Sequence, residues 1–224
     1  MRRAALFDFD NTLIDGDSQA LEVDYFRRRR EISVGRLVYI GAIYLFYSLK
    51  IAPKTALIRS CISAYRGRDH QEVIEHGDRF FQEVTSRRFF PEVIDRMRMH
   101  QGRGDLVAIL SASPIHLVLS AARFLGVELV IATALEEDAA GRLTGKTEGP
   151  VNIGPVKAAA AAALLAEHDI DPSHCTAYSD DQADMEFLQM AGSAVAVNPT
   201  PKLSDVAEKE GWEVILPASS HRPY

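Results

Sequence analysis

Two groups of aspartates in this sequence have the spacing of a site that handles a cation or a phosphoryl group. The first group, Asp8 and Asp10, closes an apolar run that begins at Ala4. Because side chains alternate along a strand, both carboxylates emerge on the same side at the end of the predicted strand. Two carboxylates this close repel each other, so a cation or a shared proton has to compensate them. Taken alone, the pair is equally compatible with a solvated acidic loop.

The second acidic group, residues 179–184 (Ser-Asp-Asp-Gln-Ala-Asp), follows a predicted strand from Cys175 to Tyr178. Helix capping explains one of its three aspartates but not all of them. If the two strands are neighbours, the two groups meet at one edge of a sheet and supply hard oxygen ligands, which suit Mg²⁺ better than Zn²⁺. The predicted ligands are Asp8, Asp10 and Asp180.

Two further polar residues lie where they would complete a phosphate site. Ser111 follows the predicted strand from Leu106 to Leu110, and Lys157 lies in the first turns of an apolar helix that begins at Pro155. A serine at the end of a buried strand is usually just a small residue, and a helix lysine is usually solvated. The order of the motifs carries the prediction: Asp-x-Asp-x-Thr, then Ser, then Lys, then Ser-Asp-Asp-x-x-Asp, each at a strand end or a helix start.

This ordered set closely resembles the haloacid dehalogenase superfamily, and within it the phosphoserine-phosphatase-like hydrolases that carry a helical cap after the first motif. The resemblance covers essentially the whole chain. It implies an Mg²⁺-dependent phosphomonoester hydrolase that acts on a small phosphorylated metabolite through an aspartyl-phosphate intermediate.

The resemblance also implies a role for each residue of the motifs. Asp8 is the expected nucleophile, and Asp10 is the expected general acid and then general base. Ser111, Lys157 and Thr12 are expected to bind the phosphoryl group or support its loop. The implied metal ligands are the Asp8 side chain, the Asp10 backbone carbonyl and Asp180, with Asp181 and Asp184 behind them.

Three positions depart from the usual phosphoserine-phosphatase pattern and disfavour phosphoserine itself as the substrate. Asp17 stands where a glutamate is usual, so either Asp17 replaces it or amine recognition is absent. Residues 111–113 read Ser-Ala-Ser in place of Ser-Gly-Gly, and Ala183 stands in place of an asparagine. Arg59 and Arg66 are further candidates for binding a substrate carboxylate or second phosphate, although an exposed arginine on a helix is the more usual case.

Two other functions stay open on these motifs. A phosphotransferase or phosphomutase on the same scaffold would pass the phosphoryl group from the aspartate to a sugar hydroxyl. A non-catalytic phospho-acceptor module resembling receiver domains also uses acidic residues, a Ser or Thr and a Lys on a parallel sheet. Receiver domains lack a large helical insertion and a late acidic cluster, which weighs against that alternative.

The elements that would position these residues alternate between strands and helices, which predicts an α/β fold with a Rossmann-like parallel sheet sandwiched by helices. The predicted strands are Ala4 to Phe9, Leu106 to Leu110, Leu129 to Ala132, Cys175 to Tyr178 and Ala194 to Val197. Only helical patterns occur between about Gly16 and Arg88. We therefore expect an all-helical cap domain at residues 16–88 and a core domain made of residues 1–15 and 89–224.

Shorter signals place turns and helix ends within this plan. Residues 141–146 (Gly-Arg-Leu-Thr-Gly-Lys) predict a hairpin or flap. Prolines mark helix starts and glycines mark helix ends. The starts are Pro53, Pro91, Pro114 and Pro155, and the ends are Gly126 and Gly192.

Composition argues against several other classes of protein. Twenty-five Lys and Arg against 31 Asp and Glu give a formal charge of −6, which offers no reason to expect a nucleic-acid partner. Cys61 and Cys175 form no zinc or disulfide pattern, and we expect two buried thiols. Asp8 and Asp10 interrupt the first apolar run before it could serve as a signal peptide, so a cytoplasmic location is expected.

The segment from Leu37 to Leu49 is the most apolar stretch of the chain. It falls well short of the roughly 20 residues that span a bilayer. We expect a buried helix or an interface helix, which leaves a homodimer open. No membrane partner is otherwise expected; the alternative is contact with a membrane surface, which the neighbouring Arg27 to Arg30 would favour.

Overall fold

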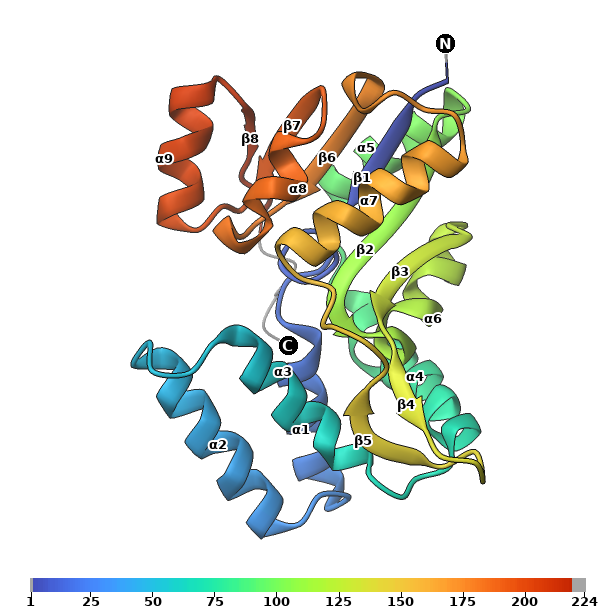
Figure 1. The fold of residues 1–224 in the computed structure, drawn as a ribbon, viewed down its shortest axis with the longest axis vertical. Coiled ribbons are helices and arrows are strands. Elements are labelled where there is room, and N and C mark those ends of the chain that lie inside the picture. Colours follow the sequence, from blue (N-terminus) through green and yellow to red (C-terminus); the bar gives the residue numbers. More distant parts are fainter. Residues whose placement is uncertain (1, 219–224) are drawn as a thin grey trace.

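A six-stranded sheet with the order β3-β2-β1-β6-β7-β8 forms the core of the computed structural model, which describes residues 2–218 (Figure 1). Every neighbouring pair of strands in it is parallel. The strands are β1 (Ala4–Phe7), β2 (Leu106–Pro114), β3 (Leu129–Thr133), β6 (Cys175–Ser179), β7 (Ser193–Val197) and β8 (Glu213–Ile215). The predicted α/β fold is confirmed.

Helices cover both faces of this sheet because consecutive strand residues point to opposite sides. Phe7 packs with α5 (Pro91–Gly102) and α6 (Ile115–Leu125) on one face. Leu6 packs on the other face, against helices of the second half of the chain. Those helices are α7 (Pro155–Glu167), α8 (Met185–Gln189) and α9 (Pro201–Glu210).

The chain between β1 and α5 is helical, as the sequence predicted. It forms α1 (Ser18–Arg29), α2 (Val34–Ser48), α3 (Lys54–Ile62) and α4 (His70–Glu83), with the short 3₁₀ turns η1 (Ser63–Tyr65) and η2 (Thr85–Arg87). Figure 1 shows α1, α2 and α3 beside the lower end of the sheet, whereas α4 lies alongside α6. Two further 3₁₀ turns, η3 (Pro172–His174) and η4 (Gln182–Asp184), flank β6.

The predicted hairpin is present as the antiparallel pair β4 (Leu135–Glu137) and β5 (Leu143–Thr147). Its backbone bonds to the cap, because Gly67 N donates to Leu143 O at 2.8 Å and Leu143 N donates to Arg68 O at 2.9 Å. Gly145 has φ +78°, and a Cβ there would lie 2.9 Å from Arg66 Cβ, so only glycine fits this contact. The hairpin thus extends the helical cap, which the sequence did not indicate.

The proline signals locate helix starts to within one residue. Pro91 and Pro155 are the first residues of α5 and α7, as predicted. Pro53 and Pro114 instead occupy the position before the first turn of α3 and α6. A fixed proline φ suits both positions, so the spacing alone does not distinguish them.

The two glycine signals have different outcomes. Gly126 adopts a left-handed conformation at the end of α6, as predicted. The prediction for Gly192 is wrong, because α8 already ends at Gln189. A Cβ at position 192 would lie only 1.9 Å from Ser173 O, so glycine is required there for close backbone approach.

Of the two expectations for the helix from Leu37 to Leu49, the buried one is wrong, and the interface one stays a prediction. This segment lies in α2, where Ile40 is the single buried residue. One side of α2 packs along α3, and the rest of its surface is open, which the apolar pattern alone could not reveal. Across residues 2–218, no helix combines the length and apolar character needed to cross a bilayer. Both cysteines are free and buried, as expected, and burial raises the pKa of each thiol to about 12.

Candidate active site

The two acidic motifs meet because β1 and β6 are neighbouring parallel strands. Phe7 pairs with Tyr178, so both strands end at the same edge of the sheet. Immediately beyond that edge, Asp8 N donates a hydrogen bond of 2.9 Å to Tyr178 O. The residues after both strands therefore enter one site, as the sequence predicted for neighbouring strands. In open α/β sheets, this edge is where ligands bind.

Lys157 links the two motifs through buried ion pairs. Its Nζ donates to Asp8 Oδ1 at 2.7 Å and to Asp184 Oδ2 at 2.6 Å. Only 2% of the lysine is exposed, so it is not the solvated helix lysine that is usual. Burial lowers the pKa of Lys157, but the charges of Asp184 and Asp8 outweigh burial and raise the pKa above its ordinary value. Ser179 Oγ also donates to Asp184 Oδ2, at 2.7 Å.

Asp10 is held by hydrogen-bond donors from α1 and β2. Its carboxylate accepts a 2.6 Å hydrogen bond from Ser18 N and a second from the hydroxyl of Ser113. Burial, and then the nearby charge of Asp17, raise the pKa of Asp10 to about 7. This carboxyl group can therefore exchange a proton near neutral pH.

Ser113 is a site residue that the sequence suggested only as a departure from the usual Ser-Gly-Gly motif. Besides its bond to Asp10, its hydroxyl accepts from Ser18 Oγ at 2.9 Å, and its backbone N donates to Ser111 Oγ at 3.0 Å. Ser111 is fully buried. The signal for Ser113 was its position two residues after Ser111 on an extended strand, which places both side chains on one side.

The remaining motif residues lie close to the same carboxylates. Thr12 is buried, and its Oγ1 lies 3.5 Å from Asp8 Oδ2, at the outer limit of a hydrogen bond. Asp180 is buried. Burial, the larger cause, and the negative charge of Asp8, the smaller one, raise its pKa to about 9. Burial also raises the pKa of Asp8, although Lys157 opposes that shift. The site thus carries more negative charge than Lys157 balances.

This surplus charge fits a divalent cation. Among residues 2–218, no three His, Cys, Asp or Glu side chains form a ready-made metal group. A cation held by the Asp8 and Asp180 carboxylates and one backbone carbonyl needs only two such side chains, with water in the other positions. That donor set is the one typical of Mg²⁺.

Lys54 reaches the site from the cap and was not singled out by the sequence analysis. Its Nζ donates a hydrogen bond of 2.7 Å to Asp181 Oδ2, although the two residues lie 127 positions apart in the sequence. Burial lowers the pKa of Lys54, but the charges of Asp181 and Asp180 outweigh it and raise the pKa. Burial alone would raise the pKa of Asp181, but the Lys54 charge lowers it. The ion pair joins the start of α3 to the loop after β6.

The cavity between cap and core is small. Its volume is about 30 Å³, roughly the room of one water molecule. Its lining combines motif residues with cap residues: Asp8, Asp10, Asn11, Asp17, Gln19, Lys54, Ile58, Ala112, Ser113, Ile153, Lys157, Asp180, Asp181, Ala183 and Asp184. A phosphate ester is larger than this volume.

The three specificity candidates are placed differently. Asp17 lines the cavity, and its side chain also caps α1 by accepting from Ala20 N at 2.9 Å. Arg59 and Arg66 are exposed, and within the described chain neither lines the cavity. The cap cation at the cavity is Lys54, and the sequence could not show which helix of the cap faces the core.

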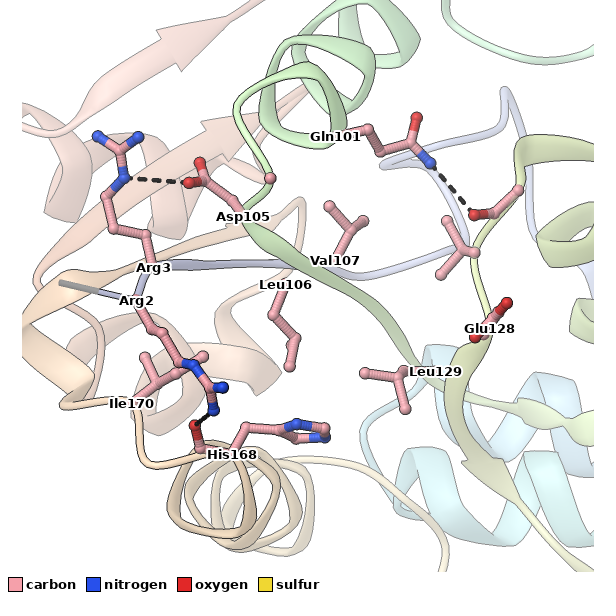
Figure 2. A pocket seen from close by; sticks show the side chains of 13 residues that line it. Arg2, Arg3, Gln101, Asp105, Leu106, Val107, Glu128, Leu129, His168 and Ile170 are labelled. Carbon is pink, nitrogen blue, oxygen red and sulfur yellow. Dashed lines mark hydrogen bonds and ion pairs between the residues drawn. The ribbon is translucent and has the colours of Figure 1, made fainter.

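A larger pocket of about 450 Å³ lies at the opposite end of the strands (Figure 2). Several of its polar groups are engaged with one another: Arg3 Nε pairs with Asp105 Oδ1 at 3.0 Å, and Arg2 Nη1 donates to His168 O at 3.2 Å. Gln101 likewise donates to Leu125 O at 2.9 Å. This pocket carries no surplus of charge comparable with that at the Asp8 edge.

Comparison with known proteins agrees with this geometry. A family model for haloacid dehalogenase-like hydrolases matches residues 5–189. The chain is 28% identical over 222 residues to a protein of Mycobacterium tuberculosis named phosphoserine phosphatase SerB1, covering 94% of this chain and 70% of that one. It is 26% identical over 223 residues to a histidinol-phosphatase of Neisseria meningitidis, covering 96% and 99% of the two chains.

The fold is shared with solved structures as well. A phosphoserine phosphatase crystallised in its apo form matches with a TM-score of 0.69 and 20% identity, over 98% of this chain and 95% of that one. The chain belongs to the haloacid dehalogenase-like hydrolase family. Within that family it is a phosphatase. The receiver-like alternative is thereby set aside.

Proposed function

We propose that this phosphatase hydrolyses a small phosphomonoester through an aspartyl-phosphate on Asp8, with Mg²⁺ as its cofactor. The observation that carries the proposal is the buried Lys157 bridge between Asp8 and Asp184 beside carboxylates whose negative charge is not fully balanced. Family membership supports the same chemistry. Asp8 and Asp180 side chains, with the Asp10 carbonyl, would hold the cation. When bound, Mg²⁺ neutralises charge on the phosphoryl oxygens.

In the first step, an Asp8 carboxylate oxygen attacks phosphorus, and the bond from phosphorus to the leaving oxygen breaks. Lys157 keeps its proton and stabilises negative charge on Asp8 and on the phosphoryl group. Asp10 gives its proton to the leaving oxygen. A pKa of about 7 suits this role because the protonated form is populated near neutral pH.

In the second step, Asp10 takes a proton from a water molecule as that water attacks phosphorus. The bond between phosphorus and the Asp8 oxygen breaks, so the carboxylate is regenerated and phosphate leaves. Ser113 and Ser18 N fix the Asp10 carboxylate for both proton transfers. Ser111 is proposed to donate its hydroxyl to the phosphoryl oxygens, with Thr12 supporting the Asp8 loop.

The substrate class follows from the cap side of the cavity. Asp17 contributes a carboxylate and Lys54 an ammonium group to the lining. A small metabolite that carries an amine beside its phosphate would place a cation near Asp17. Phosphoserine and histidinol phosphate both have this feature, and relatives of the chain are named for these two substrates. These compounds are therefore the first to test.

A screen of phosphorylated metabolites for phosphate release tests the proposal, with amino-acid, amino-alcohol, sugar and lipid head-group phosphates included. Release that requires Mg²⁺ and is lost in Asp8→Asn supports it. Acid-quenched enzyme should also carry a phosphoryl group that hydroxylamine removes, since acyl phosphates react with that reagent. Phosphate transfer to an added sugar phosphate, without release to water, would favour the phosphotransferase alternative instead.

A further inference from the structure

The outer surface of α2 is the most apolar exposed region of the described chain. Twelve large hydrophobic side chains are exposed within residues 2–218, and eight of them lie on α2 or in the turn that follows it. We call these eight residues the α2 patch: Val34, Val38, Tyr39, Tyr44, Leu45, Phe46, Leu49 and Ile51. Isolated exposed apolar residues are ordinary, but a contiguous group of this kind marks an interaction surface.

The patch follows one face of the helix. Val38 is 66% exposed and Leu45 is 55% exposed, and their spacing of seven residues places them on the same stripe of an α-helix. The opposite side faces α3, where Ile40 is buried and Arg36 Nη1 donates to Ser63 Oγ at 2.7 Å. In Figure 1, α2 is the outermost helix of the cap, on the side of α3 away from the sheet.

The electrostatic surroundings of the patch differ from those of the rest of the chain. Residues 32–68 contain no Asp or Glu and six cationic side chains, so their formal charge is +6 in a chain whose total is −6. The six are Arg36, Lys50, Lys54, Arg59, Arg66 and Arg68. Arg27 to Arg30 precede this segment at the end of α1. Lys54 is engaged at the cavity with Asp181, and Arg36 faces α3, whereas Lys50 is exposed directly after α2. An apolar surface on a positively charged segment complements a surface that is apolar inside and anionic outside.

We propose that the α2 patch docks this protein on the surface of an anionic lipid bilayer. The helix has 15 residues, so it is about 22 Å long and shorter than the roughly 30 Å hydrocarbon core. It would lie in the interface, with Val38 and Leu45 among the acyl chains. Tyr39 and Tyr44 are suited to the head-group level, where aromatic side chains with a polar end concentrate.

The charge distribution favours a bilayer over a second copy of this chain. In a twofold dimer, both partners bring the same surface to the contact, so the positively charged segments 32–68 of the two copies would come together. That arrangement is repulsive, whereas anionic head groups attract each cation near the surface. The proposal does not depend on the phosphatase mechanism, because no α2 residue lines the cavity at Asp8.

Vesicle sedimentation tests the proposal. The full chain should bind vesicles of phosphatidylcholine mixed with phosphatidylglycerol, bind phosphatidylcholine vesicles much more weakly, and dissociate as salt is raised. Leu45→Asp should weaken binding to the mixed vesicles about tenfold or more, because it places a charge among acyl chains. Lys50→Asn should weaken it about fivefold, because it removes one cation; asparagine tolerates the positive φ of 59° at this position.

Two matched variants lie on the core domain. Leu216 is 77% exposed, so Leu216→Asp makes the same apolar-to-acidic change away from the patch. Lys209→Asn removes one exposed cation from α9. Neither variant should change the affinity for vesicles by more than about twofold, because neither side chain lies near the proposed membrane contact. Circular dichroism spectra should be the same for all four variants, because each altered side chain is exposed.

Several results would overturn the proposal. The first is failure of the unaltered protein to bind mixed vesicles at low salt. The second is a loss in Leu216→Asp equal to that in Leu45→Asp. The third comes from sedimentation velocity without lipid: a dimer that Leu45→Asp converts to monomer, together with no vesicle binding, would assign the patch to self-association.

Discussion

Two buried clusters of ionisable side chains in this protein differ in whether their charges are balanced. At the carboxyl edge of the sheet, Lys157 is one cation among several carboxylates, and the pKa values of Asp10 and Asp180 rise to about 7 and about 9. In the second cluster, Glu22 of α1 is surrounded by hydrogen-bond donors from three other elements. Burial alone would raise the pKa of Glu22, but bonds from His116 and His76 lower it to about 2.

The geometry of the Glu22 cluster explains its balance. Glu22 Oε1 lies 2.7 Å from His76 Nε2 and 3.3 Å from His116 Nε2, and Tyr65 OH donates to Oε2. His116 and Tyr65 also contact each other, at 3.0 Å between Nε2 and OH. These residues come from α1, α4, η1 and α6, so the cluster ties the cap to the core. A buried charge that is satisfied by its neighbours holds structure together, whereas a surplus of buried charge indicates a missing ligand.

The largest expected effect is the loss of turnover in Asp8→Asn. The amide is nearly the same size but cannot attack phosphorus, so kcat should fall by about 10⁴-fold or more. The thermal stability of this variant, measured in the presence of a chelator, should stay the same or rise. The change removes one negative charge from a cluster that has more carboxylates than cations. Phosphate release and thermal unfolding on the same preparation check both parts. Substantial residual activity would exclude the covalent mechanism.

The opposite pattern is expected for Glu22→Gln. Removing the charge leaves His76, His116 and Tyr65 without their anionic acceptor, and breaking a buried charged cluster in this way lowers the free energy of unfolding by about 3 kcal/mol. Urea unfolding measures the change. Glu31→Gln is the matched control, because Glu31 is exposed and pairs with Arg29 at the surface. Its loss should stay below about 1 kcal/mol. Equal losses in both variants would show that the buried cluster is not special.

Metal binding should sharpen the contrast further. Chelation should abolish phosphatase activity, Mg²⁺ should restore it, and Ca²⁺, with longer and less regular bonds, should restore little. At a concentration about 100 times its dissociation constant, Mg²⁺ should stabilise the native protein by about 2.7 kcal/mol. Asp180→Asn should lose this stabilisation, whereas Glu22→Gln should keep it. Differential scanning calorimetry with and without Mg²⁺ gives the answer. Equal stabilisation of the Asp180 variant would place the metal elsewhere.

The two clusters should also respond to pH in opposite directions. The folded pKa of Glu22 lies below its ordinary value of 4.5, at about 2, so its contribution to stability is present above pH 4.5 and is lost as pH falls towards 2. The folded pKa of Asp10 lies above its ordinary value of 3.8, at about 7, so its ionisation costs stability as pH rises from 3.8 to 7. Unfolding measured in chelator over both ranges, for the unaltered protein and for Glu22→Gln and Asp10→Asn, tests the signs. Each variant should reduce the slope only in its own range, because the raised pKa values of Asp8 and Asp180 keep part of the slope above pH 3.8.

The smallest expected effect concerns substrate choice. Lys157→Ala should depress all substrates alike, because Lys157 contacts groups that every phosphomonoester shares. Lys54→Ala and Asp17→Asn should instead change the ratio of kcat/KM for the two best substrates, by about threefold to tenfold. Arg59→Ala and Arg66→Ala are the matched cap controls, because both side chains are exposed away from the cavity. A ratio that shifts in Lys157→Ala and in none of the cap variants would remove the cap from specificity.

Much of the catalytic site could be predicted because it consists of short motifs at the ends of strands. The chain direction and the pairing of β1 with β6 bring Asp8 and Asp180 together once the sheet is parallel. A carboxylate pair that nothing nearby balances is visible in the sequence itself. Alternation along the predicted strand was the reason to expect Asp8 and Asp10 on one side, although β1 itself ends at Phe7, before both of them.

Only the tertiary structure decided which side chains from other elements complete that site and which surfaces stay open. Lys54 meets Asp181 across the boundary between cap and core, and side chains from three other elements surround Glu22. The apolar pattern of α2 predicted a helix but not its exposure. The physical reason is the same in each case. Local sequence sets the conformation of a segment and the direction of its side chains, whereas long-range packing determines which partner, if any, covers them.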